Sequence, residues 1–188
     1  MKKLQGEKVK RPVAARDSFT HSRIHPFNSQ ITFANHQRTK PINRRKLGEI
    51  TEATLAELGV TDWNLTFYLV GAKKMAEINE GHLGHTGPTD VITFDYSELG
   101  TGNSKLETRS PKLRLVGEIF ICPDVAVTQA REFRTTWQSE MVRYVVHALL
   151  HLCGHDDLKP AARREMKRHE NRLVRKLDHR FQFAEISK

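Results

Sequence analysis

The stretch HALLHLCGHDD brings together side-chain types that bind metal ions. Its first two histidines, His147 and His151, are four residues apart, so on a helix they lie one turn apart on the same face. Two imidazoles in this arrangement can hold one metal ion from a single rigid element. A lone histidine on an apolar helix is usually bonded to a carbonyl group, but a pair followed at once by another histidine and two aspartates is less often accidental. The spacing therefore predicts a metal site.

The residues around the pair predict the helix that would carry it. The segment SEMVRYVVHALLHLCG begins with Ser139, a good N-cap residue, and ends with Gly154, which readily adopts the left-handed conformation that follows a helix. Valine and leucine residues occur nearly all round the segment, so the helix is predicted to be buried.

One residue type missing from this helix disfavours a peptidase. Helical zinc peptidases carry a glutamate directly after the first histidine, where it acts as the general base. Ala148 occupies that position in this chain. A metal-dependent hydrolase of another bond, such as a peptide bond, is therefore only an alternative hypothesis.

Length and composition indicate one globular domain with polar ends. The chain has 188 residues, of which 38% are hydrophobic and 28% are charged. No apolar run approaches the roughly 18 residues of a membrane helix, and no secretory signal is recognisable. The two cysteines, Cys122 and Cys153, form no CxxC motif. We therefore expect a cytoplasmic protein without a membrane partner.

The charge of the chain favours a polyanionic partner. The formal net charge is +9, and residues 1–46 hold twelve Lys and Arg against Glu7 and Asp17. A second basic concentration occurs in the C-terminal run PAARREMKRHENRLVRKLDHR. Two basic regions on either side of a metal site favour RNA or DNA as the substrate.

Strand-like and helix-like segments alternate along the chain. Strands are predicted over residues 30–35, 63–70, 90–96 and 113–122, and helices over 42–59, 72–82, 123–133, 139–154 and 160–177. This order predicts a single α/β (α+β) domain, with a mixed sheet of about four strands and helices packed on it. The metal site would lie at the end of a buried helix. Residues 1–28 are predicted to be a disordered basic arm, 29–180 the domain and 181–188 a tail.

Several blocks of the chain resemble the YbeY family of metal-dependent endoribonucleases, which act in rRNA maturation and ribosome quality control. PTDVITFDY, VGEIFIC and REMKRHENRLV follow the family's blocks in order, and the likeness spans roughly residues 30–178. The histidine-rich stretch matches the family signature His-Gly-x-Leu-His-Leu-x-Gly-Tyr-Asp-His at His147, Leu150, His151, Leu152, Gly154 and Asp156.

The resemblance implies a set of ligands for one Zn²⁺ ion. The third histidine ligand of the family falls on Asp157, and His155 stands where the family usually has tyrosine. Zinc accepts a carboxylate beside two imidazoles, so His147, His151 and Asp157 form a sound ligand set. His155 remains the alternative third ligand. Asp156 is a candidate catalytic residue that would orient a ligand imidazole, or else a turn residue that caps the chain.

The chain departs from the family pattern at Leu83, where the resemblance places an arginine thought to act at the scissile phosphate. A guanidinium group suits the charge that builds on phosphate oxygens during cleavage. Arg114, Lys112 or a residue of the arm would have to replace it. His82 and His85 flank the position and could supply acid–base chemistry, although both are as well explained as polar loop residues.

These residues together predict a metal-dependent, single-strand-preferring endoribonuclease that acts on rRNA and ribosomal particles. The absence of an arginine at position 83 leaves a second hypothesis open. In this hypothesis the chain is a zinc-stabilised assembly factor that binds rRNA or ribosomes and does not cleave RNA.

Overall fold

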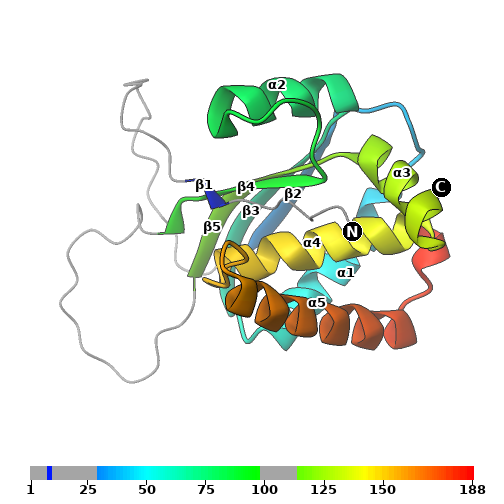
Figure 1. Ribbon diagram of the computed structural model, residues 1–188. Coiled ribbons are helices and arrows are strands. Elements are labelled where there is room, and N and C mark those ends of the chain that lie inside the picture. Colours follow the sequence, from blue (N-terminus) through cyan, green and yellow to red (C-terminus); the bar gives the residue numbers. More distant parts are fainter. Residues whose placement is uncertain (1–7, 10–28, 98–113) are drawn as a thin grey trace, which may run out of the picture.

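A computed structural model describes residues 8–9, 29–97 and 114–188 of the chain. Its centre is a mixed sheet with the strand order β1-β4-β5-β3-β2 (Figure 1). Strands β2, β3 and β5 are parallel, β4 runs antiparallel to β5, and β1 pairs in parallel with β4. The strands are β1 (Lys8–Val9), β2 (Gln30–Asn35), β3 (Asp62–Leu69), β4 (Val91–Asp95) and β5 (Arg114–Ile121).

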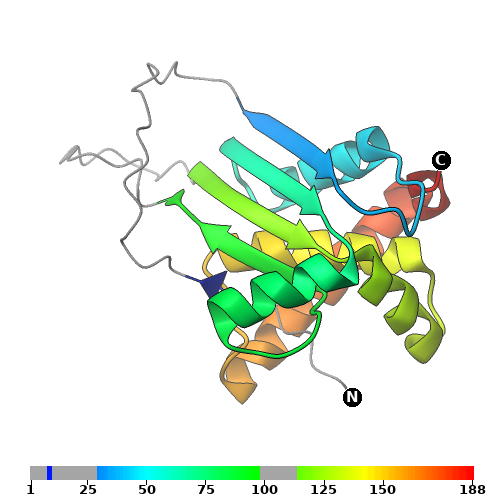
Figure 2. The same ribbon diagram turned by 90° about the horizontal axis from the view of Figure 1, so that it is seen from above.

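Helices cover both faces of this sheet. Helix α2 lies on one face, whereas α1, α4 and α5 lie on the other, with α4 directly beneath the strands (Figures 1 and 2). The helices are α1 (Arg44–Glu57), α2 (Ala72–Leu83), α3 (Pro123–Phe133), α4 (Trp137–Leu152) and α5 (Pro160–Arg180). The predicted α/β domain with four main strands is confirmed, and the two-residue β1 adds a fifth strand at the edge. No described helix combines the length and apolarity that a bilayer crossing requires.

Helix α4 is the most deeply buried helix because its apolar side chains face neighbours on several sides. Val142, Val145 and Val146 pack in one hydrophobic core with Leu115 and Ile119 of β5. The side chains of β5 alternate between buried and half-buried, so one face of the strand meets α4 and the other faces α2. A long buried helix of this kind is a rigid support for any side chain that it carries.

The start of α4 differs from the prediction that Ser139 is its N-cap. Thr136 is the N-cap, and its side-chain oxygen accepts a hydrogen bond from the Ser139 backbone N–H at 3.2 Å. Both residue types cap helices well, so the choice depends on where the preceding turn ends. The predicted end is confirmed, because Gly154 adopts a positive φ of 91° just after the helix.

The structure describes the predicted C-terminal tail but little of the predicted N-terminal arm. The basic arm over residues 1–28 lies outside the described residues, apart from the short strand β1. The predicted tail, in contrast, folds onto the domain. It forms the 3-10 helix η2 (Phe183–Ile186), where Ile186 is fully buried and its carbonyl accepts a hydrogen bond from the Asn43 N–H at 2.7 Å.

Candidate metal centre

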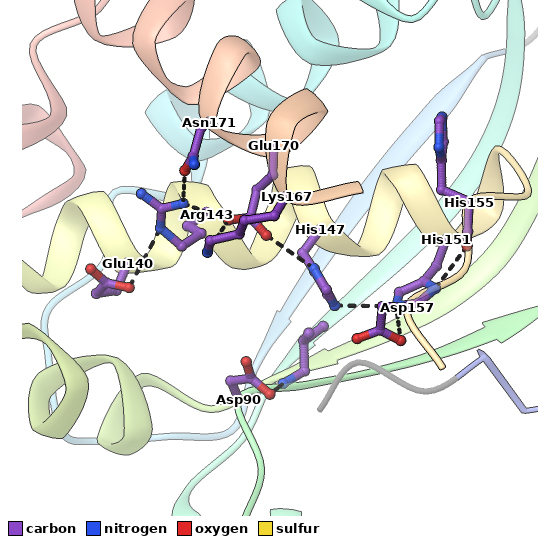
Figure 3. Close-up of polar contacts among 11 residues, drawn as sticks. Asp90, Glu140, Arg143, His147, His151, His155, Asp157, Lys167, Glu170 and Asn171 are labelled. Carbon is purple, nitrogen blue, oxygen red and sulfur yellow. Dashed lines mark hydrogen bonds and ion pairs between the residues drawn. The ribbon is translucent and has the colours of Figure 1, made fainter. Parts of the chain in front are cut away.

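Helix α4 directs two histidine side chains toward one point. His147 and His151 are 3% and 2% exposed, and their Nε2 atoms are 3.1 Å apart. The turn after α4 brings Asp157 to the pair, with its Oδ1 atom 3.9 Å from Nε2 of His151 (Figure 3). One ligand atom from each of these three residues lies within 4.8 Å of the other two. The three residues are called the HHD cluster below.

The hydrogen bonds of the two rings assign their tautomers. Nδ1 of His147 lies 3.1 Å from a carboxylate oxygen of Glu170, and Nδ1 of His151 lies 3.1 Å from the backbone carbonyl of His155. Both partners only accept hydrogen bonds, so each Nδ1 carries the proton in the neutral ring. The two Nε2 lone pairs therefore face each other, an arrangement that a shared cation would stabilise.

The dimensions of the HHD cluster fit a small divalent cation. Ligand atoms about 2.0–2.2 Å from a tetrahedral zinc ion stand about 3.3 Å apart. The measured separations bracket this value, and Asp157 needs only a small shift toward the pair. Burial raises the pKa of the Asp157 carboxyl, against the opposing effects of His147 and Arg163. A cation beside the carboxylate would offset the cost of this burial.

A buried glutamate of α5 holds the first histidine in place. Glu170 is 1% exposed, and besides His147 it contacts Arg143 and Lys167, whose Nζ lies 2.7 Å from Oε1 (Figure 3). Burial by itself would raise the pKa of Glu170, but the hydrogen bond from His147 and the two positive charges lower it to about 2. Glu170 therefore stays ionised and can accept the Nδ1 proton of His147 at neutral pH.

Sequence reasoning did not single out Glu170, although α5 carries a signal for it. The buried face of α5 contains Met166, Leu173, Val174 and Leu177, and Glu170 occupies a position on that same face. An acidic residue on an otherwise apolar helix face needs a buried partner. Its partner is 23 residues away along the chain, so only the folded structure identifies it as His147.

The two remaining polar residues of the turn lie outside the HHD cluster. The ring of His155 points away from it and packs against His169, with ring centroids 4.9 Å apart (Figure 3). Asp156 is exposed, and its side chain accepts a hydrogen bond from the Leu158 backbone N–H at 3.0 Å. Asp156 therefore adopts the turn-forming arrangement, whereas Glu170 and the His155 carbonyl contact the imidazoles of the HHD cluster.

Comparison with known proteins identifies the family. The sequence model described as "Endoribonuclease YbeY" matches residues 30–178. The chain belongs to the YbeY family. A relative named Endoribonuclease YbeY from Parabacteroides distasonis is 30% identical over 142 residues, which cover 76% of this chain and 91% of the relative. One from Bacteroides fragilis, with the same name, is 32% identical over 133 residues, covering 71% and 86%.

A solved structure has a similar fold. The solution structure of TM1509 from Thermotoga maritima aligns with a TM-score of 0.51 at 23% sequence identity, covering 79% of this chain and 89% of that one. At this level of identity the comparison supports the fold. The predicted resemblance to the YbeY family is thus confirmed by sequence, and the predicted architecture by structure.

The residues flanking the departure from the YbeY pattern lie on the α2 side of the sheet. Leu83 packs at the edge of a small hydrophobic cluster, and His82 contacts the ring of Phe94 edge-on at 5.2 Å. His85 follows the left-handed Gly84 that ends α2. The structure brings neither histidine into the HHD cluster.

Arg114 also lies away from the HHD cluster. Its Nε atom is 3.3 Å from Asp62 at the start of β3, in an ion pair whose two side chains are both about 40% exposed. Alternation along β5 places Arg114 on the same face as Glu118 and Phe120, which is the face opposite α4. The HHD cluster and the predicted phosphate-binding arginine therefore occupy different faces of the sheet.

Asp90 is a further polar residue near the cluster that sequence reasoning did not select. It is 2% exposed at the start of β4, and its Oδ1 atom accepts hydrogen bonds from the Thr89 hydroxyl and the Val91 N–H. Its Oδ2 atom has no hydrogen-bond partner among the described residues. Burial raises the pKa of Asp90, and the nearby His147 ring and the hydrogen bonds from Thr89 and Val91 oppose this shift. Figure 3 shows Asp90 facing the histidines across the site.

A cleft of about 660 Å³ opens beside the HHD cluster. His147 and Asp157 line one end of it, α5 forms one wall, and the end of α3 with the following turn forms the other. We call it the His147 cleft. Because His147 and Asp157 belong to its lining, a substrate in this cleft would contact two residues of the HHD cluster.

Proposed function

We propose that the chain is a metal-dependent, single-strand-preferring endoribonuclease that acts on rRNA. The observation that carries the proposal is the pair of buried Nε2 atoms 3.1 Å apart beside Asp157, where His147 and Asp157 line a cleft. Membership of the YbeY family supports cleavage of RNA as the reaction, because the relatives share the name Endoribonuclease YbeY.

Zn²⁺ is the proposed ion, held by His147, His151 and Asp157. Two imidazoles with one carboxylate are a ligand set that zinc uses in hydrolytic sites, where a fourth position stays open. When bound there, the ion supplies a Lewis acid that activates water and polarises a phosphoryl oxygen at neutral pH. We retain Asp157 over His155 as the third ligand, because the His155 ring is directed toward His169.

Two acceptors keep the imidazoles in the ligating tautomer. Glu170 accepts the Nδ1 proton of His147, and the His155 carbonyl accepts that of His151. Each Nε2 lone pair is thereby directed into the site, and neither ring can rotate without losing a hydrogen bond. Glu170 is therefore a positioning residue, a role for which the sequence offers Asp156 as a candidate.

Asp90 is the proposed polar contact on the opposite side of the site. Its unpartnered Oδ2 atom can form a hydrogen bond with the attacking water or with the substrate once either enters. The block that resembles the YbeY family allows either asparagine or aspartate at this position. We therefore assign Asp90 to hydrogen bonding and not to proton transfer.

Arg114, His82 and His85 remain weaker candidates for a catalytic role. Arg114 pairs with Asp62 on the α2 face of the sheet, and His82 packs against Phe94. Each would need to move relative to the sheet to reach a phosphate at the HHD cluster. The charge on the phosphate must therefore be met chiefly by other cationic groups, and the His147 cleft contains four.

The proposed setting is the cytoplasm, with ribosomal particles as the source of substrate. The net charge of +9 favours a polyanionic partner, and basic residues are frequent along α5. Cys122 and Cys153 are both free thiols, which suits a reducing compartment.

Cleavage of single-stranded RNA by metal-depleted and zinc-reloaded protein tests the proposal. The protein is stripped with a chelator, dialysed and divided, and one half receives an equimolar amount of Zn²⁺. A labelled rRNA fragment and the same fragment annealed to its complement are the substrates. We expect cleavage only after reloading and faster on the single strand, whereas His147→Ala should stay inactive after the same treatment.

The same experiment tests the second candidate function, a zinc-stabilised factor that binds rRNA without cutting it. Leu83 at the position of the YbeY arginine is the observation that favours this alternative. Zinc-loaded protein that binds the fragment tightly and leaves it intact would replace the nuclease proposal with the binding factor.

A further inference from the structure

The His147 cleft has basic groups that are not fully engaged within the protein. Arg143 contacts Glu140 and Glu170, and Lys167 contacts Glu170, so these two cations are largely matched by buried carboxylates. Arg163 donates from Nε to the Asp157 carbonyl at 2.9 Å, which leaves its two terminal nitrogens for a ligand. Neither Arg163 nor Arg164 forms an ion pair with another described residue. The α5 wall therefore presents two guanidinium groups next to the HHD cluster.

The opposite wall carries an exposed aromatic ring. Phe133, at the end of α3, is 44% exposed and lines the cleft. Among the described residues it is one of two large hydrophobic side chains that are exposed, the other being Leu158. A single exposed ring is common on protein surfaces, but this ring lines the same cleft as two guanidinium groups. An unpaired base is a suitable partner for it, since bases of single-stranded RNA stack on exposed aromatic rings.

We propose that the His147 cleft is a nucleotide-binding subsite for the residue of single-stranded RNA next to the scissile phosphate. The base stacks on Phe133, and the flanking phosphate contacts Arg163 and Arg164 on the facing wall. The volume of about 660 Å³ lies within the range of roughly 300–1,000 Å³ found for small-molecule sites, which is large enough for a nucleotide. The inference rests on the proposed function, because it takes RNA as the substrate.

The subsite also accounts for the leucine at position 83. A nuclease without the YbeY arginine on the α2 side must hold the phosphate backbone in another way. Arg163 is close to the HHD cluster because it is hydrogen-bonded to the backbone of Asp157, and Arg164 lines the same cleft. This mode of binding favours single-stranded RNA, since a base inside a duplex is already stacked on its neighbours.

Binding of a labelled RNA oligonucleotide to zinc-loaded protein tests the subsite, with fluorescence anisotropy as the readout at several salt concentrations. The two test variants are Phe133→Ala and Arg164→Ala. Their matched controls are Leu158→Ala, which removes the other exposed large apolar side chain, and Arg168→Ala, which removes an exposed arginine of α5 that does not line the cleft. Zinc content and thermal unfolding are measured for each variant, so that a misfolded protein is recognised.

Phe133→Ala should weaken binding of the RNA roughly 5- to 100-fold, the range expected for loss of one stacked base. It should have almost no effect on an oligonucleotide of equal length that lacks bases, because its backbone charge is unchanged. Arg164→Ala should weaken both oligonucleotides and reduce the slope of log affinity against log salt by about 0.7, the value for one phosphate contact with a single strand. Both controls should bind like the wild type.

The possible results test the subsite and the nuclease activity separately. If Phe133→Ala and Arg164→Ala bind like their controls while the wild type binds and cleaves RNA, the subsite is wrong and the nuclease function stands. If the wild type binds RNA in a Phe133-dependent way but never cleaves it, base stacking in the cleft stands, whereas its place beside a scissile phosphate and the nuclease function are wrong. If the wild type binds no RNA, both are wrong.

Discussion

The two faces of the central sheet differ in how their polar side chains are held. On the α4 face, His147 and His151 are buried and lie close to Asp157. A hydrogen-bond acceptor holds each ring through its Nδ1 atom. On the α2 face, Arg114 lies in a half-exposed ion pair and His82 packs against an aromatic ring. A site for chemistry must hold its groups in position before the substrate arrives, and only the first arrangement does so.

The arrangement on the α4 face has an energetic cost that indicates a function. Glu170, Asp90 and Asp157 are all at most 8% exposed, and burial of carboxylates is unfavourable unless cations or donors surround them. Glu170 has such partners, whereas Asp90 and Asp157 have raised pKa values. Perturbed carboxyl groups that gather beside two histidines are typical of functional sites.

Replacing a ligand histidine should have the largest effect. His147→Ala removes one proposed zinc ligand and leaves Glu170 buried without its histidine partner. We expect loss of bound zinc, loss of RNA cleavage and a fall in unfolding free energy of roughly 3–5 kcal/mol, since a buried charge loses one of its partners. Metal analysis and urea unfolding measure the two effects. Retention of one tightly bound zinc ion by this variant would show that the ion binds elsewhere.

Replacing Glu170 should have the next largest effect, on metal affinity. Glu170→Gln keeps the shape of the side chain but offers His147 a weaker acceptor, so zinc affinity should fall about 10- to 100-fold. Competition with a chromophoric chelator measures it. The matched control is Glu165→Gln, an exposed glutamate on the same helix that contacts no ligand. Equal zinc affinities for the two variants would mean that Glu170 has no role in positioning His147.

The low pKa of Glu170 predicts how the stability of metal-free protein depends on pH. The folded-state pKa is about 2, below the ordinary value of 4.5, so the stabilisation is fully present above pH 4.5 and is lost as the pH falls toward 2. The advantage of the wild type over Glu170→Gln should therefore shrink by about 2 kcal/mol between pH 6 and pH 3. Urea unfolding at both pH values measures this, and a difference independent of pH would contradict it.

Changes on the α2 face should have the smallest effect. Arg114→Ala removes a half-exposed ion pair, which contributes at most about 1 kcal/mol of stability. Cleavage of RNA should change by less than about twofold, within the range of surface substitutions. A loss of cleavage of tenfold or more, with zinc still bound, would place Arg114 in the path of the substrate, as the sequence had suggested.

The sequence predicted the elements well because their signals are local. Periodic apolar residues located all four main strands and five helices within a few residues, and the spacing of His147 and His151 indicated that helix α4 carries a candidate metal site. What it missed depends on contacts between distant segments. The partnership of Glu170 with His147, the burial of Asp90 beside α4 and the packing of Ile186 against the chain near Asn43 all arise only once the chain folds.

The catalytic candidates taken from the sequence differ from the groups around the HHD cluster for a related reason. His82 and His85 flank position 83 in the chain, and Arg114 is a candidate replacement for the arginine missing there. Its strand approaches α4, but alternation of side chains along β5 turns Arg114 to the other face of the sheet. Because side chains alternate along a strand, two neighbouring residues face opposite sides of the sheet.

A crystal structure of zinc-loaded protein, with anomalous data collected at the zinc absorption edge, tests the central claim most directly. We predict one anomalous peak, about 2.0–2.2 Å from Nε2 of His147, Nε2 of His151 and a carboxylate oxygen of Asp157. The ring of His155 should remain against His169. A peak more than about 4 Å from the Asp157 carboxylate, or one coordinated by His155, would contradict the assigned ligand set.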